Sequence, residues 1–165
     1  TREHCKEIPV SKAEDVVVTI TDYRPSEVDD ANMIDMLISE YRIIHIWPQG
    51  HLDLDYIKKI WKPCWEGKVE IIGRSLHAFD QLLMSNSNLD YVGTRLHGGI
   101  RAMQFKRRCI ILEVDNRAKE KAEKFGLVTV ERGRLDALKK LVVNDFETNI
   151  KLPVAEIEAW KGQFK

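Results

Sequence analysis

The sequence has no apolar run long enough to cross a bilayer and no excess of charge of either sign. Its longest apolar stretches, residues 16–20 and 109–112, are far shorter than the roughly 20 residues that a membrane-spanning helix needs. Basic and acidic residues both number 26, so the formal net charge is zero. No block of like charge is typical of a nucleic-acid-binding arm. We therefore expect no membrane span and no nucleic-acid partner.

Cysteine is scarce, and the first residues lack the pattern of a signal peptide. Cys5, Cys64 and Cys109 are widely spaced, with no Cys-x-x-Cys pair, which favours a reducing compartment over a disulfide framework. The opening Thr-Arg-Glu-His-Cys-Lys lacks an initiator Met and the basic, apolar, small-residue order of a signal peptide. We expect a cytoplasmic location and a chain excised from a longer protein.

Several common catalytic motifs are missing. The sequence has no Gly-x-Gly-x-x-Gly after its first strand-like run, no Gly-Lys-Ser/Thr phosphate loop and no Gly-x-Ser-x-Gly nucleophile elbow. These absences disfavour a dinucleotide dehydrogenase, a P-loop NTPase and a serine hydrolase. No histidines, cysteines or carboxylates have a metal-ligand spacing. We expect neither a metal nor a bound cofactor.

What the sequence does contain is an alternation of strand-like and helical segments, at intervals of roughly 20 to 25 residues. The strand-like runs cover residues 16–21, 43–47, 69–73, 89–93, 109–114 and 127–130. Amphipathic helices are predicted over 30–41, 54–61, 77–83, 96–105 and 118–125, the last one closed by Gly126. This order predicts an α/β fold with a doubly wound, mostly parallel, Rossmann-like sheet of about six strands.

The length and composition fit one domain. A chain of 165 residues, 44% of them hydrophobic, can bury one substantial core but hardly two. We expect a single domain over residues 1–165, with its core in 16–132. Two further helices in 134–163 would cover the sheet or reach a neighbouring domain.

The loop after the fourth strand is the main candidate site, because open parallel sheets bind ligands beyond the carboxyl ends of their strands. It reads Gly-Thr-Arg-Leu-His-Gly-Gly over residues 93–99. Arg95 and His97 flank an apolar residue and could face one cleft, where the arginine fork could hold a phosphate or carboxylate and the imidazole could move a proton. The start of the next helix also favours an anion. Thr94, Gly98 and Gly99 complete this candidate substrate-binding set.

Plainer interpretations stand beside this one. Arg95 and His97 could be a surface cation and a capping side chain, while the two glycines serve tight helix–sheet packing. For Arg24, in the first loop, and Arg74, in the third, an ordinary solvated residue is the favoured interpretation. Trp61 and Trp65 could form a sugar-stacking or interdomain surface, but packing is favoured for such an aromatic pair.

The fourth loop and the segment after it resemble a known family. The run Asp-Tyr-Val-Gly-Thr-Arg-Leu-His-Gly-Gly-Ile-Arg-Ala-Met from Asp90, then Asp115, Lys119 and a Phe-Gly-Leu ending, is similar to the C-terminal domain of polysaccharide pyruvyl transferases. The similarity extends over roughly residues 16–127. It implies two Rossmann-like domains arranged as in GT-B glycosyltransferases, and transfer of pyruvyl from phosphoenolpyruvate to a sugar during cell-surface polysaccharide synthesis. This chain would then be the C-terminal half, and its partners a missing N-terminal domain and a sugar or lipid-linked saccharide acceptor.

The resemblance also implies roles for individual residues. Arg95, His97 and Arg24 would hold the phosphate and carboxylate of phosphoenolpyruvate. Ketal formation needs a proton donor and electrostatic stabilisation, so His97 and Arg95 are the expected catalytic residues, His97 acting as general acid or as phosphate ligand. The base for the sugar hydroxyl could be Asp22, Glu113 or a group of the missing domain.

Two alternative functions remain open. The chain could be half of a GT-B type glycosyltransferase or sugar-nucleotide epimerase, in which the same helix start holds a nucleotide diphosphate. It could also be a non-catalytic binding or assembly domain.

Overall fold

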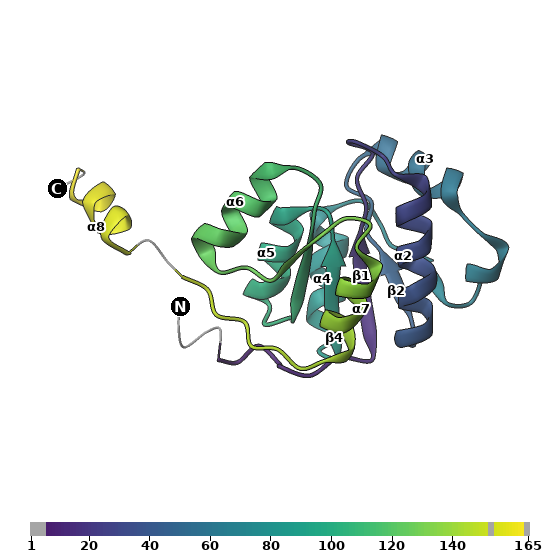
Figure 1. The fold of residues 1–165 in the computed structure, drawn as a ribbon, viewed down its shortest axis with the longest axis horizontal. Coiled ribbons are helices and arrows are strands. Elements are labelled where there is room, and N and C mark those ends of the chain that lie inside the picture. Colours follow the sequence, from purple (N-terminus) through teal and green to yellow (C-terminus); the bar gives the residue numbers. More distant parts are fainter. Residues whose placement is uncertain (1–5, 152–153, 164–165) are drawn as a thin grey trace.

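The structure is a computed structural model that describes residues 6–151 and 154–163 (Figure 1). Its strands are β1 (Asp15–Thr19), β2 (Ile44–Ile46), β3 (Val69–Ile71), β4 (Leu89–Gly93), β5 (Cys109–Glu113) and β6 (Thr129–Glu131). Its α-helices are α2 (Glu27–Glu40), α3 (His51–Ile60), α4 (Leu76–Ser85), α5 (Leu96–Gln104), α6 (Asn116–Phe125), α7 (Leu135–Val143) and α8 (Val154–Gly162).

The six strands form one sheet in the order β3-β2-β1-β4-β5-β6, and all five neighbouring pairs are parallel. The predicted doubly wound, Rossmann-like sheet is therefore confirmed. Strands β2 and β3 lie on one side of β1. Strand β4, the next in the chain, lies on the other side of β1, and β5 and β6 follow it there. Such a reversal of strand order creates the switch point at which α/β sheets bind ligands.

Strand β1 lies at the centre of the sheet and serves both of its faces. All five of its residues are buried, as expected of a strand covered on both sides. Val16 and Val18 point into one hydrophobic cluster, while Val17 points into the other. This alternation follows from the two-residue period of a strand.

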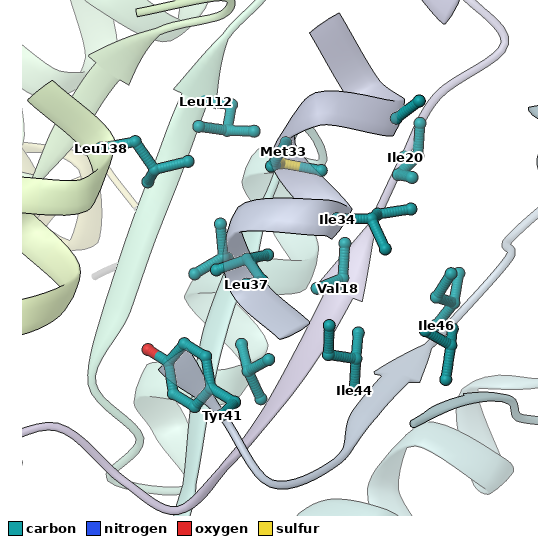
Figure 2. Packing of buried hydrophobic residues seen from close by; sticks show 14 of the residues in the cluster. Val18, Ile20, Met33, Ile34, Leu37, Tyr41, Ile44, Ile46, Leu112 and Leu138 are labelled. Atoms are coloured by element: carbon teal, nitrogen blue, oxygen red, sulfur yellow. The ribbon is translucent and has the colours of Figure 1, made fainter. Parts of the chain in front are cut away.

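The larger cluster packs α2, α3 and α7 against one face of the sheet. Figure 2 shows Ile34 and Leu37 of α2 lying over Val18 of β1. Leu138 brings α7 to the same cluster, and α2 and α7 lie side by side in Figure 1. The opposite face holds the second cluster, to which α4 contributes Phe79 and α5 contributes Met103.

Three details differ from the sequence predictions or extend them. Helix α2 begins at Glu27, three residues before the predicted start, with three acidic residues in a first turn where they complement the helix dipole. An unpredicted 3-10 turn, Pro63–Trp65, follows α3. Trp65 is fully buried and donates a hydrogen bond to Asp35 at 2.6 Å, and Trp61 packs against it edge to face, which confirms the packing interpretation for this pair.

The two C-terminal helices differ in their relation to the sheet. Helix α7 covers the sheet as predicted, whereas α8 lies apart from it in Figure 1. Over the described ranges, no helix is long and apolar enough to cross a membrane.

The two described cysteines differ in exposure. Cys64 is exposed and Cys109 is buried, both as free thiols, and Cys5 lies outside the described residues.

Candidate functional site

The candidate site lies where the carboxyl ends of β1 and β4 meet, at the switch point of the sheet. The two strands pair in parallel, with Thr19 opposite Gly93 as the last pair. The chain then leaves β1 as a loop through Asp22 and Arg24, and leaves β4 through Thr94 and Arg95. Two loops predicted to carry functional side chains therefore begin at neighbouring positions.

Gly93 allows the two strands to approach closely at this point. A Cβ atom on residue 93 would lie 2.1 Å from the hydroxyl oxygen of Thr19 and 2.7 Å from its carbonyl oxygen. Real Cβ atoms do not tolerate such distances from backbone atoms. The glycine of this loop is thus required by strand-to-strand contact.

A closed ring of three hydrogen bonds fixes the backbone of Arg95. The Arg95 amide donates to the Thr19 hydroxyl at 3.4 Å, and the Tyr91 hydroxyl donates to the Arg95 carbonyl at 2.7 Å. The two hydroxyl groups lie 2.6 Å apart, so Thr19 donates to Tyr91 and each hydroxyl gives one bond and accepts one. The ring holds the residue that caps α5 at both its N–H and its C=O group.

The Arg95 side chain is held by a buried carboxylate, that of Asp53. Arg95 Nη2 lies 2.6 and 2.7 Å from the two Asp53 oxygens. The fully buried Asp53 also accepts backbone N–H bonds from Asp22, Gln49 and Gly50, at 3.0, 3.1 and 3.0 Å. One carboxylate therefore joins the loops that follow β1, β2 and β4.

Arg95 keeps one donor that the described part of the chain does not use. Its Nε is buried without a hydrogen-bond partner in the described part of the chain, while Nη2 faces Asp53. Asp22 lies beside it, with Oδ1 at 3.6 Å from Nη2. The side chains of Arg95 and Asp22 are 30% and 35% exposed, so both are accessible to solvent at the crevice.

The two carboxyl groups have pKa values shifted in opposite directions. Burial opposes ionisation of Asp53, but the backbone N–H groups of Asp22 and Gly50 and the Arg95 guanidinium outweigh it and lower its pKa. The pKa of Asp22 is raised, first by its hydrogen bond with the Asp53 carboxylate and then by burial. Asp53 is thus the fixed negative charge, and Asp22 is the group that more readily holds a proton.

Arg24 lies on the same edge of the sheet in an uncommon backbone conformation. Its φ is +51°, in the left-handed region, and its carbonyl oxygen accepts a hydrogen bond from Arg132, which follows β6. Its guanidinium lies 5.5 Å from the centre of the Tyr23 ring. An open cavity of about 240 Å³ is lined by Tyr23, Arg24, Asp115 and Asn116. The exits of β1 and β5 therefore share one hollow beside the switch point.

The remaining predicted residues have varied surroundings. His97 is exposed in the first turn of α5. The Thr94 hydroxyl donates to the Thr19 carbonyl at 3.3 Å. Gly98 and Gly99 are buried, and added Cβ atoms there would lie 2.8 Å from the Tyr91 hydroxyl and 3.1 Å from Ile111 Cγ1, as the packing interpretation expected. Ligand binding by these four residues stays a prediction.

Sequence reasoning missed Asp53 and Arg132. Asp53 lies in the first turn of α3, and its carboxylate accepts the N–H of Gly50, the N-cap residue. An acidic residue three positions after a helix N-cap is a common capping signal, so the spacing predicts a helix start but not the contact with Arg95. Arg132 follows a three-residue strand, and nothing in its own neighbourhood indicates Arg24 as a partner.

A second cavity, larger than the hollow at Arg24, lies away from the switch point. It measures about 340 Å³ and runs between residues 6–10, before β1, and residues 147–150, after α7. This position is at the amino ends of the strands. The carboxyl edge remains the candidate site because the unused donor of Arg95 is there.

Comparisons with known proteins agree with the fold. No protein family matches the sequence, and no curated protein does. Two solved structures of UDP-GlcNAc 2-epimerase from Methanocaldococcus jannaschii are similar, one of them a complex with UDP-GlcNAc and UDP. They share 17% and 15% identity with this chain, at TM-scores of 0.64 and 0.58. Each comparison covers 96% of this chain.

The chain spans about half the length of those structures, covering 49% and 48% of their chains. At this identity the likeness is one of fold. The described domain is therefore Rossmann-like and resembles one half of an enzyme with a GT-B-like fold.

Proposed function

We propose that this chain is the phosphate-binding half of a two-domain enzyme that acts on sugars, and that its anionic substrate binds at Arg95. The observation that carries the proposal is the divided use of the Arg95 guanidinium. Nη2 is held by the fully buried Asp53, and Nε has no hydrogen-bond partner in the described part of the chain, yet the side chain as a whole is 30% exposed. A phosphate or carboxylate oxygen in the crevice can therefore reach the guanidinium.

The first candidate substrate is phosphoenolpyruvate, which the Arg95-Leu96-His97 motif and Arg24 favour. In pyruvyl transfer, the methylene carbon of phosphoenolpyruvate gains a proton, and the neighbouring carbon forms bonds to two sugar oxygens. The bond from that carbon to the phosphate oxygen breaks, and phosphate leaves. One hydroxyl proton balances the proton added to carbon, and the other leaves with phosphate. Arg95 and Arg24 would bind the anionic groups, and His97 would supply a proton or bind phosphate.

The second candidate is a nucleotide-sugar, as in a GT-B glycosyltransferase or a sugar-nucleotide epimerase. The likeness to UDP-GlcNAc 2-epimerase supports this candidate better than it supports pyruvyl transfer. A pyrophosphate at the start of α5 would use the same positive end of the helix and the same arginine.

Binding of phosphoenolpyruvate and of UDP-GlcNAc to the 165-residue chain tests the proposal. A ligand at one hundred times its Kd stabilises a protein by about 2.7 kcal/mol, or about 5 to 10 °C in Tm at this size. We expect one ligand to produce such a shift. Arg95→Ala and the charge-preserving Arg95→Lys should weaken it, and Arg74→Ala, on an exposed loop of the same edge, should not.

The outcome also separates the candidates. Stabilisation by phosphoenolpyruvate alone supports pyruvyl transfer, and stabilisation by UDP-GlcNAc alone supports the nucleotide-sugar alternative. If neither ligand binds at millimolar concentration, or if binding persists unchanged in both Arg95 variants, the proposed phosphate site is wrong.

A further inference from the structure

Two carboxyl groups share one arginine at the crevice. Arg95 Nη2 lies 2.6 Å from Asp53 Oδ1 and 3.6 Å from Asp22 Oδ1. When both acids are ionised, these three side chains carry one net negative charge, at the point where the proposed ligand would bring more. Anion binding there requires some means of reducing the repulsion.

Asp53 is poorly suited to take up a proton. Its two oxygens accept three backbone N–H bonds in addition to Arg95, and the side chain is fully buried. Each of these donors favours the ionised carboxylate, and protonation would leave donors without an acceptor.

Asp22 has the opposite character. Its side chain is 35% exposed, so a proton can reach it from water. The charged groups that face it are Asp53 from α3 and Arg95 from the loop between β4 and α5. Its pKa is already raised without a ligand, first by the hydrogen bond with Asp53, and a second anion nearby would raise it further.

We propose that Asp22 takes up one proton when an anionic ligand binds at Arg95, so that its carboxyl group no longer repels the ligand. This inference rests on the proposed function, since it needs an anion at Arg95. Binding would thereby be coupled to pH. Affinity then falls as pH rises from the Asp22 pKa of the free protein to that of the complex, by up to about tenfold per pH unit.

The test is ligand affinity as a function of pH, measured by calorimetry for whichever of phosphoenolpyruvate and UDP-GlcNAc binds. Every variant is measured both in the unmodified chain and in a His97→Gln background, so that a contribution of the His97 side chain is recognised. We expect affinity to fall as the pH rises with Asp22 present. Asp22→Asn should flatten that dependence and bind about tenfold more tightly at a pH at which Asp22 of the parent is ionised. Asp55→Asn removes an exposed carboxylate on α3 and should behave like its parent.

Proton uptake provides a second measurement, taken directly with UDP-GlcNAc and as a difference from Asp22→Asn with phosphoenolpyruvate, because a phosphate monoester itself titrates at about pH 6. Calorimetry at one pH in two buffers of different ionisation enthalpy reports the protons bound with the ligand, and we expect between half a proton and one. Arg95-dependent binding with no proton uptake, or with the same pH dependence in Asp22→Asn, would overturn this inference and leave the proposed function standing. No binding of either ligand by the unmodified chain at any pH would overturn both.

Discussion

Arg132 forms a bidentate ion pair with the Asp30 carboxylate, although the two residues are 102 positions apart in the chain. Its Nε donates to Oδ1 at 2.9 Å, its Nη2 donates to Oδ2, and Tyr56 donates to the same Oδ2 at 2.6 Å. Asp30 is fully buried and the Arg132 side chain is 9% exposed. The pair joins the start of α2 to the exit of β6.

Arg132→Ala should therefore destabilise the fold strongly. Removing one partner leaves a buried carboxylate without its counter-ion, which costs about 3 to 5 kcal/mol. Urea unfolding would measure this loss. The double variant Asp30→Leu/Arg132→Met, which replaces both charges, should lose clearly less than Arg132→Ala. Equal losses would mean that the unpaired Asp30 carboxylate is not the cause of the loss in Arg132→Ala.

A methyl group on residue 93 should be poorly tolerated. In Gly93→Ala the new Cβ would meet the Thr19 hydroxyl and backbone at 2.1 to 2.8 Å, so β1 and β4 would have to separate. Overpacking of this kind costs about 1 to 3 kcal/mol or more. Gly162→Ala, at a position with no atom within 4 Å, should change the unfolding free energy by less than about 0.5 kcal/mol. Similar unfolding midpoints for the two variants would contradict this expectation.

The order of elements was predictable, but the contacts between the loops were not. All six strands were expected close to their observed positions. Runs such as residues 16–18 and 109–112 are continuously apolar, which is typical of a strand buried on both faces of a sheet. The loop after β4 was also recognisable from its composition. Asp53 was not, because a helix-capping acid and an acid that holds a distant arginine have the same sequence signal. Partners that lie far apart in the chain leave no local pattern.

Loss of the Tyr91 hydroxyl should weaken both the fold and the Arg95 loop. Tyr91→Phe removes the hydroxyl that donates to the Arg95 carbonyl and accepts from the Thr19 hydroxyl. The side chains of Tyr91 and Thr19 are both fully buried. The expected cost is about 1 to 3 kcal/mol. Amide hydrogen exchange should quicken at Arg95, whose N–H donates to Thr19. Tyr23→Phe, on an exposed ring, is the matched control, and equal behaviour of the two variants would show that the hydroxyl ring is not needed.

Acid should weaken the fold in part through Asp15. The hydrogen bonds from Arg42, at 2.8 and 3.0 Å, lower the pKa of Asp15 below its usual 3.8. The stabilisation is therefore present above about pH 4 and is lost as the pH falls through the lower pKa of the folded state. Arg42→Gln should reduce the urea midpoint at about pH 6, and the difference from the parent should shrink towards about pH 2. A difference that stays constant with pH would rule out this linkage.

The hydrogen bond from Arg132 to the Arg24 carbonyl has a consequence for synthesis on the ribosome. These residues are 108 positions apart, and β1, which leads to Arg24, is the first strand of this sheet to be made. At ordinary translation rates, Arg132 is added roughly 5 to 20 s after Arg24. Until then the left-handed turn at Arg24 lacks this support. The nascent chain would thus acquire this edge of the crevice only after β6, the last strand of the sheet, has been made.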